Sequence, residues 1–420
     1  MERPIVRSIE AFALDDRWSR AIPFLAAAAI FAGARALPEG SSRRWFLSLA
    51  AISPLLLLHA GEARAYALFA LLSLGVFLLA SRSRESAPAA VALALLAAAA
   101  LYTHYLGLFV VAALLGLTLI QRRFLSAAGL GGGVLLFLPW TRILREQPPE
   151  ATQWIRDAPL ETAAGLLGGL GGAPRLAPAL GGPLPRALIL AGAAASLLLT
   201  GALLRASRRD PALRTALAFV GLTFGALLAV SFWRPAAFPG RSEMAVLPVW
   251  FWAAARGAAS DRACRAAAGA VALVSLIAGA LVLRAQAANM PPWEPATAAL
   301  ARVSGRGDLV LAAGPFYLPA RLAADRGEAG ARVVAFPPEL AEHPGWISPR
   351  APFRDDGRAR EAARVCRRGC RLVFLGYLPH FTRELQEIFR EAGAPRILWR
   401  RGQAVIIRSE PPPPPTSPTS

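Results

Sequence analysis

The sequence His59-Ala60-Gly61-Glu62-Ala63-Arg64-Ala65-Tyr66 lies between two apolar runs, Trp45 to Leu58 and Ala65 to Leu79. Each run is long enough, or nearly long enough, to cross a bilayer, for which a helix needs about 20 residues. An imidazole, a carboxylate, a guanidinium and a phenol therefore gather at one predicted membrane boundary. Charged groups so close to hydrocarbon are costly unless they are paired, solvated or bound to a ligand.

Two interpretations of this stretch stay open when only the residues are considered. In the first, it is an interfacial belt in which Arg64 extends toward water, Tyr66 lies at headgroup level and Glu62 faces solvent. In the second, Arg64 and Tyr66 bind an anionic lipid headgroup and Glu62 orients them. The second interpretation rests on the planar guanidinium, whose donors match the oxygens of a phosphate.

The composition excludes an ordinary soluble enzyme. Of the 420 residues, 55% are hydrophobic, which is typical of a protein that crosses the membrane several times. The formal net charge is +19, and arginine supplies all the basic side chains because the sequence contains no lysine. Among residues 22–285 the arginines fall mostly in gaps between apolar runs, where we interpret them as topology signals. We therefore expect the lipid bilayer as a partner and no nucleic acid.

The hydropathy pattern predicts an α-helical polytopic membrane protein with about ten transmembrane helices, in a membrane domain over residues 22–285. The predicted spans are roughly 22–37, 45–60, 65–81, 88–104, 106–121, 124–142, 186–205, 212–232, 243–258 and 265–284. The stretch 88–121 also suits a single re-entrant element.

Arginine is unevenly distributed among the gaps between these spans. Four of the gaps hold Arg64 alone, no arginine around His104, a long sparse loop, and Arg234 with Arg241. The other gaps each hold two or more arginines, at Arg43-Arg44, Arg82 and Arg84, Arg122-Arg123, Arg205 to Arg214, and Arg256 to Arg265. They are every second gap, and by the positive-inside rule they are cytoplasmic. The alternate segments then lie on the outer face: the N-terminus, residues 59–66, the turn at His104, the loops 143–185 and 233–242, and the C-terminal region.

Residues 291–410 have a different character, because short strand-like runs alternate with helix-like ones. The predicted strands are 308–312, 332–336, 371–375 and 404–407, and the predicted helices are 294–303, 316–325, 358–367 and 382–392. This alternation predicts a small α/β domain, which would be extracytoplasmic.

Two further segments have distinct compositions. Within the loop 143–185, the apolar stretch 160–170 predicts a helix that lies on the membrane surface rather than crossing it. Residues 411–420 contain five consecutive prolines with Ser and Thr, which is typical of a disordered tail. The glycine-rich stretch 129–133 lies inside an apolar span with no strand before it, so it is no nucleotide-binding motif.

Polar side chains on the predicted outer face are the candidates for binding and catalysis. They are Glu62, Arg64, Tyr66, His104, Tyr105, Trp154, Arg241 and Glu243. An enzyme that acts on a lipid phosphate needs arginine or a metal for the phosphate, a carboxylate as base and a shielded cavity. His104 suits a metal ligand or a proton carrier, but also an interfacial side chain between two tyrosines. Arg241 and Glu243 also suit a simple ion pair at the start of a span.

Several motifs, in order along the chain, resemble those of bacterial family-39-type glycosyltransferases. These are membrane enzymes of the GT-C class, related to protein mannosyltransferases and to the aminoarabinose transferase of lipid A. The motifs that carry the resemblance are Ser53-Pro54 with Gly61 to Leu68, Leu101 to Gly107, Gln153-Trp154-Ile155, Pro239 to Glu243 with Leu247-Pro248, and Gly307 to Val310. Ser242 stands where the family pattern has tyrosine.

The resemblance implies a GT-C-like fold in the bacterial inner membrane, with an extracytoplasmic C-terminal domain. It implies transfer of a sugar from a polyprenyl-phosphate donor to a cell-envelope acceptor, which is a lipid, a glycan or a protein, at the outer face. The donor phosphate would bind near Arg64, Tyr66 and Arg241. The supporting residues would be Glu62, His104, Tyr105, Glu243 and Trp154, and Glu62 with His104 would hold a divalent metal if the enzyme uses one.

The sequence departs from the family pattern at its start. Residues 1–21 resemble the late part of the family's first outer loop, so we interpret them as a remnant of that loop. Family members carry an earlier helix and an acidic motif that supplies the aspartate assigned to catalysis. We therefore expect either a start further upstream or the loss of the usual base, because Asp15 and Asp16 match a different position.

Two other classes of function stay open. The first is a catalytically inactive GT-C-like scaffold or partner protein, which the missing acidic motif and Ser242 favour. The second is a lipid-carrier transporter, which predicts ionisable residues at mid-membrane or broken helices in paired repeats. The sequence shows neither of these transporter features clearly.

Overall fold

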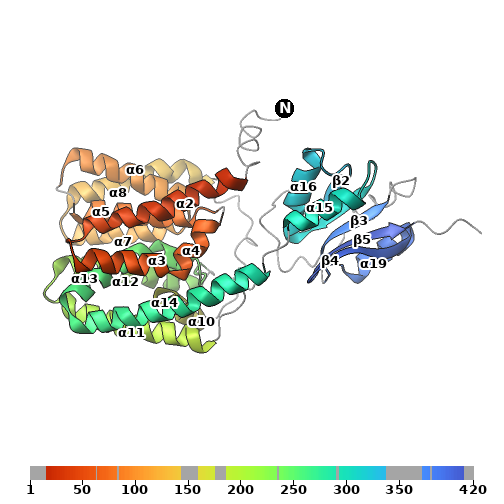
Figure 1. Ribbon diagram of the computed structural model, residues 1–420. Helices are drawn as coiled ribbons and strands as arrows, with labels where there is room; N and C mark the ends of the chain where they lie inside the picture. The colour runs from red at the N-terminus through yellow and green to blue at the C-terminus, as the bar shows by residue number, and fades with distance from the viewer. Residues whose placement is uncertain are drawn as a thin grey trace, which may run out of the picture. The chain divides into compact units, whose positions relative to one another are not determined.

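The computed structural model describes residues 16–62, 64–82, 85–142, 159–175, 186–233, 236–289, 293–336, 371–378 and 381–410. The chain divides into two compact units, Met1–Met290 and Pro291–Ser420, which are described separately below (Figure 1). Trp154, the predicted helix 358–367 and the tail 411–420 lie outside the described residues.

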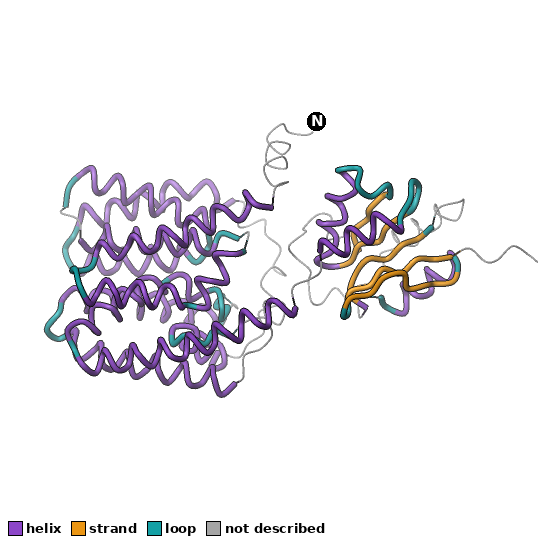
Figure 2. Tube along the Cα trace, viewed as in Figure 1, coloured by secondary structure: helices purple, strands orange, loops and turns teal. Residues whose placement is uncertain are grey.

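The first unit is a bundle of helices (Figure 2). In order these are α2 (Asp16–Ala32), η1 (Gly33–Ala36), α3 (Ser41–Ile52), α4 (Pro54–Gly61), α5 (Tyr66–Arg82), α6 (Ala87–Thr103), α7 (Gly107–Ile120), α8 (Phe124–Phe137), η2 (Leu138–Trp140), α10 (Pro159–Leu170), α11 (Arg186–Ser207), α12 (Pro211–Ser231), η5 (Ser242–Ala245), α13 (Leu247–Ser260) and α14 (Arg262–Asn289). Each of the ten predicted spans corresponds to a helix or to two successive helices. The predicted helix at 160–170 is confirmed as α10.

Fewer of these helices meet the length of a full span than the sequence predicts. Among the described residues, three helices are long and apolar enough to cross a membrane, at Arg186–Ser207, Pro211–Ser231 and Arg262–Arg284. A fourth is added if α3 and α4 form one span. The other apolar helices, such as α6 and α7, are shorter than the roughly 20 residues that a straight crossing requires.

The break between α3 and α4 corrects the predicted continuous span 45–60. The two helices are bent by 57° at Ser53-Pro54. Pro54 has no backbone N–H and cannot continue the hydrogen bonds of α3. The Ser53 hydroxyl instead accepts the N–H of Leu56 at 3.4 Å and caps α4. The bend gives α4 its own direction, and α4 carries His59 in its last turn.

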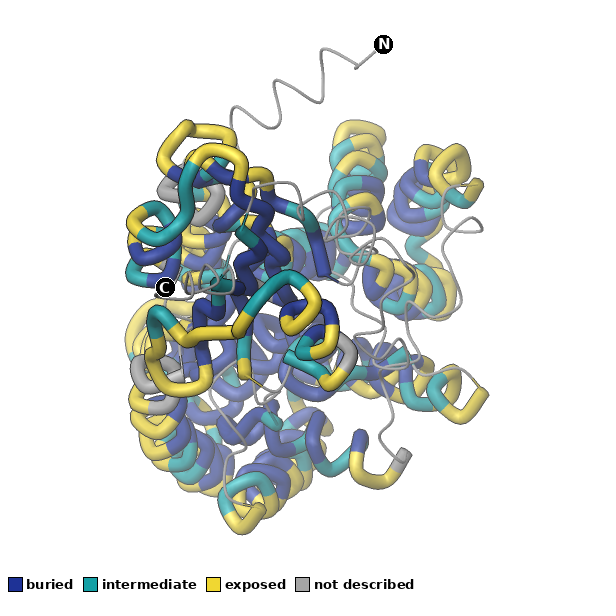
Figure 3. Tube along the Cα trace, turned by 90° about the vertical axis from the view of Figure 1, so that its right-hand side faces the viewer, coloured by how far each residue is buried: buried dark blue, intermediate teal, exposed yellow. Residues whose placement is uncertain are grey.

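Helix α13 forms the centre of the bundle. Almost all of its residues are buried, and it packs against α3, α12 and α14. Trp250 and Trp252 are fully buried, and the Trp250 indole N–H donates to the Leu170 carbonyl oxygen at 3.1 Å. The surrounding helices instead alternate between buried and exposed positions (Figure 3). Their exposed residues include leucines such as Leu198 and Leu273, which indicates faces that contact lipid.

The arginine-rich gaps come together in space, as their alternation along the sequence predicts. The Glu85 carboxylate accepts the N–H groups of Leu125 and Ser126 at 3.3 and 3.1 Å, which joins two of these gaps. Asp210 accepts from the Arg256 guanidinium, which joins two others. Further contacts at this end join Arg123 to Ala80, Gln121 to Thr215, and Arg205 to Asp261.

The second unit contains a five-stranded sheet in the order β2-β1-β3-β5-β4, with helices α15, α16 and α19. The strands are β1 (Leu309–Ala313), β2 (Arg332–Phe336), β3 (Leu372–Tyr377), β4 (Ala394–Arg401) and β5 (Ala404–Glu410), and the helices are α15 (Trp293–Val303), η6 (Gly314–Phe316), α16 (Tyr317–Asp325) and α19 (Arg383–Ala392). Strand β1 is parallel to β2 and β3, whereas β5 is antiparallel to β3 and β4. The predicted α/β character of this unit is confirmed.

Strand β4 was not predicted. Its sequence, Ala394 to Arg401, begins with Ala-Pro and contains three arginines, so it lacks the alternation of a half-buried strand. It is an edge strand, most of its residues are exposed, and its pairing with β5 shifts register between Ile397 and Trp399. Proline and arginine are tolerated at such an edge.

Candidate functional site

The first part of the site is the turn between α4 and α5. Helix α4 ends at Gly61, and the backbone of Glu62 is extended, with φ −88° and ψ 135°. The Arg64 N–H then donates to the Glu62 carbonyl oxygen at 2.7 Å, and α5 begins at Tyr66. The short turn therefore places the imidazole, carboxylate, guanidinium and phenol of the 59–66 stretch within one bend of the chain.

The second part is the turn between α6 and α7, which carries His104. The His104 N–H donates to the Ala100 carbonyl oxygen at 3.1 Å, and its carbonyl oxygen accepts the Gly107 N–H at 2.8 Å. A Cβ atom on Gly107 would lie 2.8 Å from the Ala100 oxygen, so glycine permits this tight turn. The His104 Nδ1 accepts the Leu106 N–H at 3.1 Å, which fixes the orientation of the ring.

The third part is the loop at residues 238–243. Gly240 has φ +87°, a backbone conformation that favours glycine. Its N–H donates to both carboxyl oxygens of Glu243, each at 2.9 Å. The Phe238 N–H donates to the Ser242 hydroxyl at 2.9 Å, and Ser242 is buried. Ser242 thus closes the loop.

These three segments meet through the side chains of His59, Tyr66 and Arg241. The His59 Nε2–H donates to the Gly240 carbonyl oxygen at 2.8 Å, which joins the first turn to the loop. The Tyr66 ring lies 4.8 Å from the His59 ring and 5.1 Å from the His104 ring, measured between centroids. The Arg241 guanidinium carbon lies 5.7 Å from the Tyr66 ring centroid, within the range of a cation–π contact.

The Glu62 carboxylate lies in the middle of this positive environment. Its Oε2 is 2.9 Å from the His59 Nδ1, and its side chain is 15% exposed. Burial alone would raise the pKa of Glu62. The hydrogen bond and charge of His59, together with the charges of Arg64 and Arg241, outweigh burial and lower that pKa below its usual value. Glu62 is therefore ionised and its charge is already compensated.

His104 is neutral at physiological pH. Burial, assisted by the nearby charges of Arg241 and His59, lowers the pKa of His104 to about 4. Its ring is surrounded by aromatic side chains, with centroids 4.3 Å from Tyr105 and 5.4 Å from Phe69. His104 is therefore part of an aromatic wall beside Tyr66 rather than a source of positive charge.

Glu243 is buried behind the site. Its side chain is fully buried, and burial raises its pKa to about 8 in spite of the backbone hydrogen bond from Gly240. A Cβ atom at Gly169 of α10 would lie 2.2 Å from the Glu243 Oε1, so the glycine provides the space that this side chain occupies. Glu243 therefore holds the loop from behind, as a neutral acid that no substrate reaches.

Arg64 has the opposite environment, because its side chain is exposed at the edge of the cluster. Within the described part of the chain, its guanidinium forms no hydrogen bond or salt bridge. An exposed guanidinium beside a compensated carboxylate is free to bind an anion.

The structure brings together most of the residues that the sequence predicts for the site. Glu62, Tyr66, His104, Tyr105, Arg241 and Glu243 belong to one cluster, with Arg64 at its edge. Trp154 lies outside the described residues. The prediction omitted His59 from the site, although it lies only three residues before Glu62, at the C-terminal end of α4, and its Nδ1 is 2.9 Å from the Glu62 carboxylate.

The described residues do not form a metal centre of the usual kind. No group of three or more His, Cys, Asp or Glu side chains among them is arranged to hold an ion. At the site itself, the His104 Nδ1 accepts a backbone N–H, so the proton of the neutral ring is on Nε2. Both nitrogens of His59 are also engaged. The described geometry thus leaves no imidazole lone pair directed at a cation.

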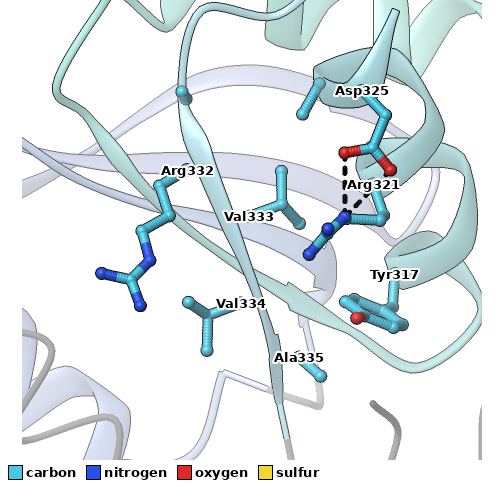
Figure 4. Close-up of a pocket in the computed structure, with 9 residues that line it drawn as sticks. Tyr317, Arg321, Asp325, Arg332, Val333, Val334 and Ala335 are labelled. Atoms are coloured by element: carbon cyan, nitrogen blue, oxygen red, sulfur yellow. Dashed lines mark hydrogen bonds and ion pairs between the residues drawn. The ribbon is translucent and has the colours of Figure 1, made fainter. Parts of the chain in front are cut away.

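The second unit has a hollow of its own at the edge strand β2 (Figure 4). Its volume is about 500 Å³, and it is lined by parts of α16 and β2. Arg321 and Asp325 pair across one side at 3.0 Å, and Tyr317 lies below them. Because its acid and base are paired and both are half exposed, this hollow shows no catalytic arrangement.

Comparison with known proteins finds a likeness in fold but none in sequence. No family model matches the chain, and no curated protein matches it. Two crystal structures of ArnT from Cupriavidus metallidurans are similar in fold, one in the apo state and one bound to undecaprenyl phosphate. The apo structure gives a TM-score of 0.58 at 13% identity, covering 94% of this chain and 84% of that chain.

The structure with undecaprenyl phosphate gives a TM-score of 0.59 at 12% identity, covering 94% of this chain and 85% of that chain. At this level of identity the likeness concerns the fold, and membership of family 39 stays a prediction. The apolar helices indicate an integral membrane protein. The chain therefore has an ArnT-like fold, with a helical membrane part and a small C-terminal sheet domain.

Proposed function

We propose that the chain is a membrane glycosyltransferase that moves a sugar from a polyprenyl-phosphate donor to a cell-envelope acceptor at the outer face of the bacterial inner membrane. The observation that carries the proposal is the gathering of Arg64, Arg241 and Tyr66 around Glu62 in an ArnT-like fold. The ArnT structure that holds undecaprenyl phosphate supports a polyprenyl phosphate as the class of ligand.

The arginines suit the charge that develops in this reaction. The bond between the sugar C1 and the phosphate oxygen breaks, and its electron pair stays on that oxygen. The phosphate passes from a diester with one negative charge to a monoester with two, while the acceptor hydroxyl oxygen bonds to C1. Guanidinium groups beside the phosphate stabilise the leaving group more strongly than the bound donor, which lowers the barrier.

The acceptor hydroxyl must also lose its proton to a base. Glu62 is the ionised carboxylate in the described part of the site, and it is partly exposed. Glu243 does not serve, because it is fully buried and neutral below about pH 8. We therefore assign proton removal to Glu62, or else to an acidic residue outside the described ranges.

The test is donor turnover by the full chain in lipid nanodiscs. The substrate is a radiolabelled polyprenyl-phosphate sugar in the presence of an envelope lipid extract as acceptor. We expect loss of label from the donor, and a decrease of at least about tenfold in Arg64→Ala and in Glu62→Gln. Full activity in a folded Arg64→Ala protein would contradict the assignment of the phosphate site.

The compensated state of Glu62 favours one other candidate function. A carboxylate already bonded to His59 at 2.9 Å, with its pKa lowered, is a weak base. A non-catalytic GT-C-like protein that binds a polyprenyl phosphate, as a scaffold or partner of a complete enzyme, would need the arginines but no base. It predicts binding of the lipid phosphate without any donor turnover.

A divalent cation at Glu62 and His104 stays a prediction that turnover measurements test. Because His104 presents a proton at Nε2, a cation there would require a rearrangement of the His104 turn. We derive no step of the reaction through a metal. Loss of activity after EDTA treatment, with recovery on adding Mg²⁺ or Mn²⁺, would establish a cation requirement.

A further inference from the structure

His59 is the buried residue that connects two of the three parts of the site, the α4–α5 turn and the loop 238–243. Its side chain has no exposed surface, and it lies in the last turn of α4. Its Nδ1 is 2.9 Å from the Glu62 carboxylate, and its Nε2 is 2.8 Å from the carbonyl oxygen of Gly240, which is 181 residues away in sequence. The ring thus bridges the α4–α5 turn and the loop that carries Arg241.

The chemistry of the two partners determines where the His59 protons are. A carbonyl oxygen only accepts, so Nε2 carries a hydrogen. A single further proton lies between Nδ1 and the Glu62 oxygen. The ring thus ties the Glu62 carboxylate to the backbone of Gly240.

The bond to Gly240 has a geometric consequence for Arg241. Gly240 is held on both sides, because its carbonyl oxygen accepts from His59 while its N–H donates to the buried Glu243 carboxyl. Arg241 is the next residue, and its guanidinium lies over the Tyr66 ring at 5.7 Å. The His59 ring itself contacts Tyr66, with centroids 4.8 Å apart. The guanidinium also lies over the Phe238 ring at 4.9 Å, and His59 contacts two of the groups that place it, Gly240 and Tyr66.

We propose that His59 is a positioning residue that fixes Arg241 against Tyr66, where its guanidinium meets the phosphate of a polyprenyl phosphate. The proposal deepens the function given above and rests on it. His59 does not touch the ligand, because it is fully buried behind Glu62 and Tyr66. It acts through the Gly240 carbonyl, which sets the backbone of Arg241, and through its pairing with Glu62.

A positioning role makes a prediction that a purely structural role does not. If His59 acts through Arg241, its removal has no further effect on ligand binding once Arg241 has been removed. A residue that only stabilises the fold would instead weaken binding by the same factor in either background. A double-mutant cycle on the affinity for undecaprenyl phosphate separates these two cases.

The measurement uses the full chain in nanodiscs, with undecaprenyl phosphate as probe and undecaprenol as the uncharged control. We expect His59→Ala and Arg241→Ala each to weaken binding of the phosphate by about tenfold or more, equivalent to about 1.4 kcal/mol or more. The double variant is expected to bind within about threefold of Arg241→Ala. Binding of undecaprenol should be the same in all of them.

Two conservative variants separate the effect of the hydrogen bond to Gly240 from the effect of the contact with Glu62. His59→Gln places an amide nitrogen near the Nε2 position and retains a donor to Gly240, whereas His59→Asn places its amide near Nδ1 and retains the contact to Glu62. Because the Gly240 bond sets the backbone of Arg241, we expect His59→Gln to recover more of the affinity than His59→Asn. The reverse order would overturn the positioning role.

Ser73 offers a matched control on the same part of the structure. Its hydroxyl is fully buried on α5 and donates to the Ala245 carbonyl oxygen, so Ser73→Ala also removes a buried bond to the backbone that follows the loop. Because this bond is made to Ala245 and not to Gly240 or Arg241, we expect affinity within about twofold of the wild type. Thermal unfolding of each variant establishes that it is folded.

The outcomes distinguish the positioning role from the proposed function. If the wild type does not bind undecaprenyl phosphate more tightly than undecaprenol, the proposed function and the positioning role are both wrong. If the wild type binds and Arg241→Ala weakens binding, but the loss from His59→Ala is the same in both backgrounds, the function stands and the positioning role is wrong. An equal loss in Ser73→Ala would likewise reduce His59 to a structural role.

Discussion

Arg64 differs from the other charged groups of the site because its side chain is exposed and, in the described part of the chain, forms no salt bridge. We predict that Arg64→Ala weakens binding of undecaprenyl phosphate by about tenfold to a hundredfold. Arg64→Lys should lose less, since it retains a charge but not the planar pair of donors. Binding assays in nanodiscs measure this.

Arg44 is the control for Arg64. It is also exposed, but it lies in an arginine-rich gap, away from the segments that form the site. Arg44→Ala should bind the lipid phosphate like the wild type. If both substitutions weaken binding equally, the arginines act through the general charge of the protein, and the local assignment of the phosphate site is wrong.

Glu243 predicts a pH dependence of stability. The folded state holds its proton up to about pH 8, whereas the unfolded chain releases it near the usual 4.5. Its contribution to stability is therefore complete below about pH 4.5 and is lost as the pH rises through about 8. Glu243→Gln, which stays neutral, should have a Tm that exceeds the wild-type Tm by an increasing margin across this range.

Thermal unfolding in detergent micelles, followed by tryptophan fluorescence, measures that margin at several pH values. The difference between the two proteins should grow with pH and level off above about pH 8, where Glu243 is ionised in both states. A difference that is constant with pH would mean that Glu243 is ionised in the folded protein and has a partner that the described contacts lack.

At the level of elements, the packing of α10 against α11 depends on glycines. A Cβ atom at Gly171 would lie 1.7 Å from the Gly192 carbonyl oxygen, a backbone atom that cannot move aside easily. We predict that Gly171→Ala destabilises the protein by about 1–3 kcal/mol, because overpacking forces the helices apart. Thermal unfolding in nanodiscs should show a clear decrease in Tm.

Gly201, on the same helix α11, is the matched control. A Cβ atom there meets nothing within 4 Å, so Gly201→Ala adds a better helix former in open space. Its Tm should be equal to or above that of the wild type. A decrease as large as that of Gly171→Ala would show that any added methyl group on these helices is harmful, whatever its neighbours.

In the second unit, Asp308 fixes the start of strand β1. Its carboxylate is buried and accepts from the Arg371 guanidinium at 2.9 and 3.1 Å and from the backbone N–H groups of Gly305 and Arg371. Asp308→Ala leaves these donors without their acceptor and should destabilise the unit by about 2 kcal/mol or more. Hydrogen exchange of the full chain should accelerate in β1 and β3.

Asp325 provides the comparison for Asp308. It pairs with Arg321 at 3.0 Å, but both side chains are about half exposed, so Asp325→Ala should cost at most about 1 kcal/mol. Exchange in β1 and β3 should then match the wild type. If hydrogen exchange accelerated similarly in both variants, the buried Asp308 would stabilise the unit no more than the exposed pair of Asp325 and Arg321 does.

The sequence predicts most elements of this protein but not their breaks and edges. Apolar runs locate the helices of the bundle, and the alternation beyond residue 291 locates four of the five strands. The bend at Ser53-Pro54 was missed because the apolar run continues through it, and hydropathy does not register the missing N–H of proline. Strand β4 was missed because an exposed edge strand needs no apolar alternation.

At the scale of the whole molecule, the sequence predicts which segments form the site but not which side chains in it make contact. The arginine alternation correctly places residues 59–66, the His104 turn and the loop with Arg241 at one end of the bundle. It cannot show which of these side chains touch, because the contact between His59 and Gly240 joins positions 181 residues apart. That contact depends on the direction that the Pro54 break gives to α4.

The likeness in fold to ArnT extends over 94% of the chain, and one of the two ArnT structures is bound to undecaprenyl phosphate. The most direct test is an experimental structure of the chain in a nanodisc with undecaprenyl phosphate. We predict the phosphate within about 3 Å of the guanidinium groups of both Arg64 and Arg241, with the Tyr66 ring beside it. A phosphate bound elsewhere, with neither arginine in contact, would contradict the central claim.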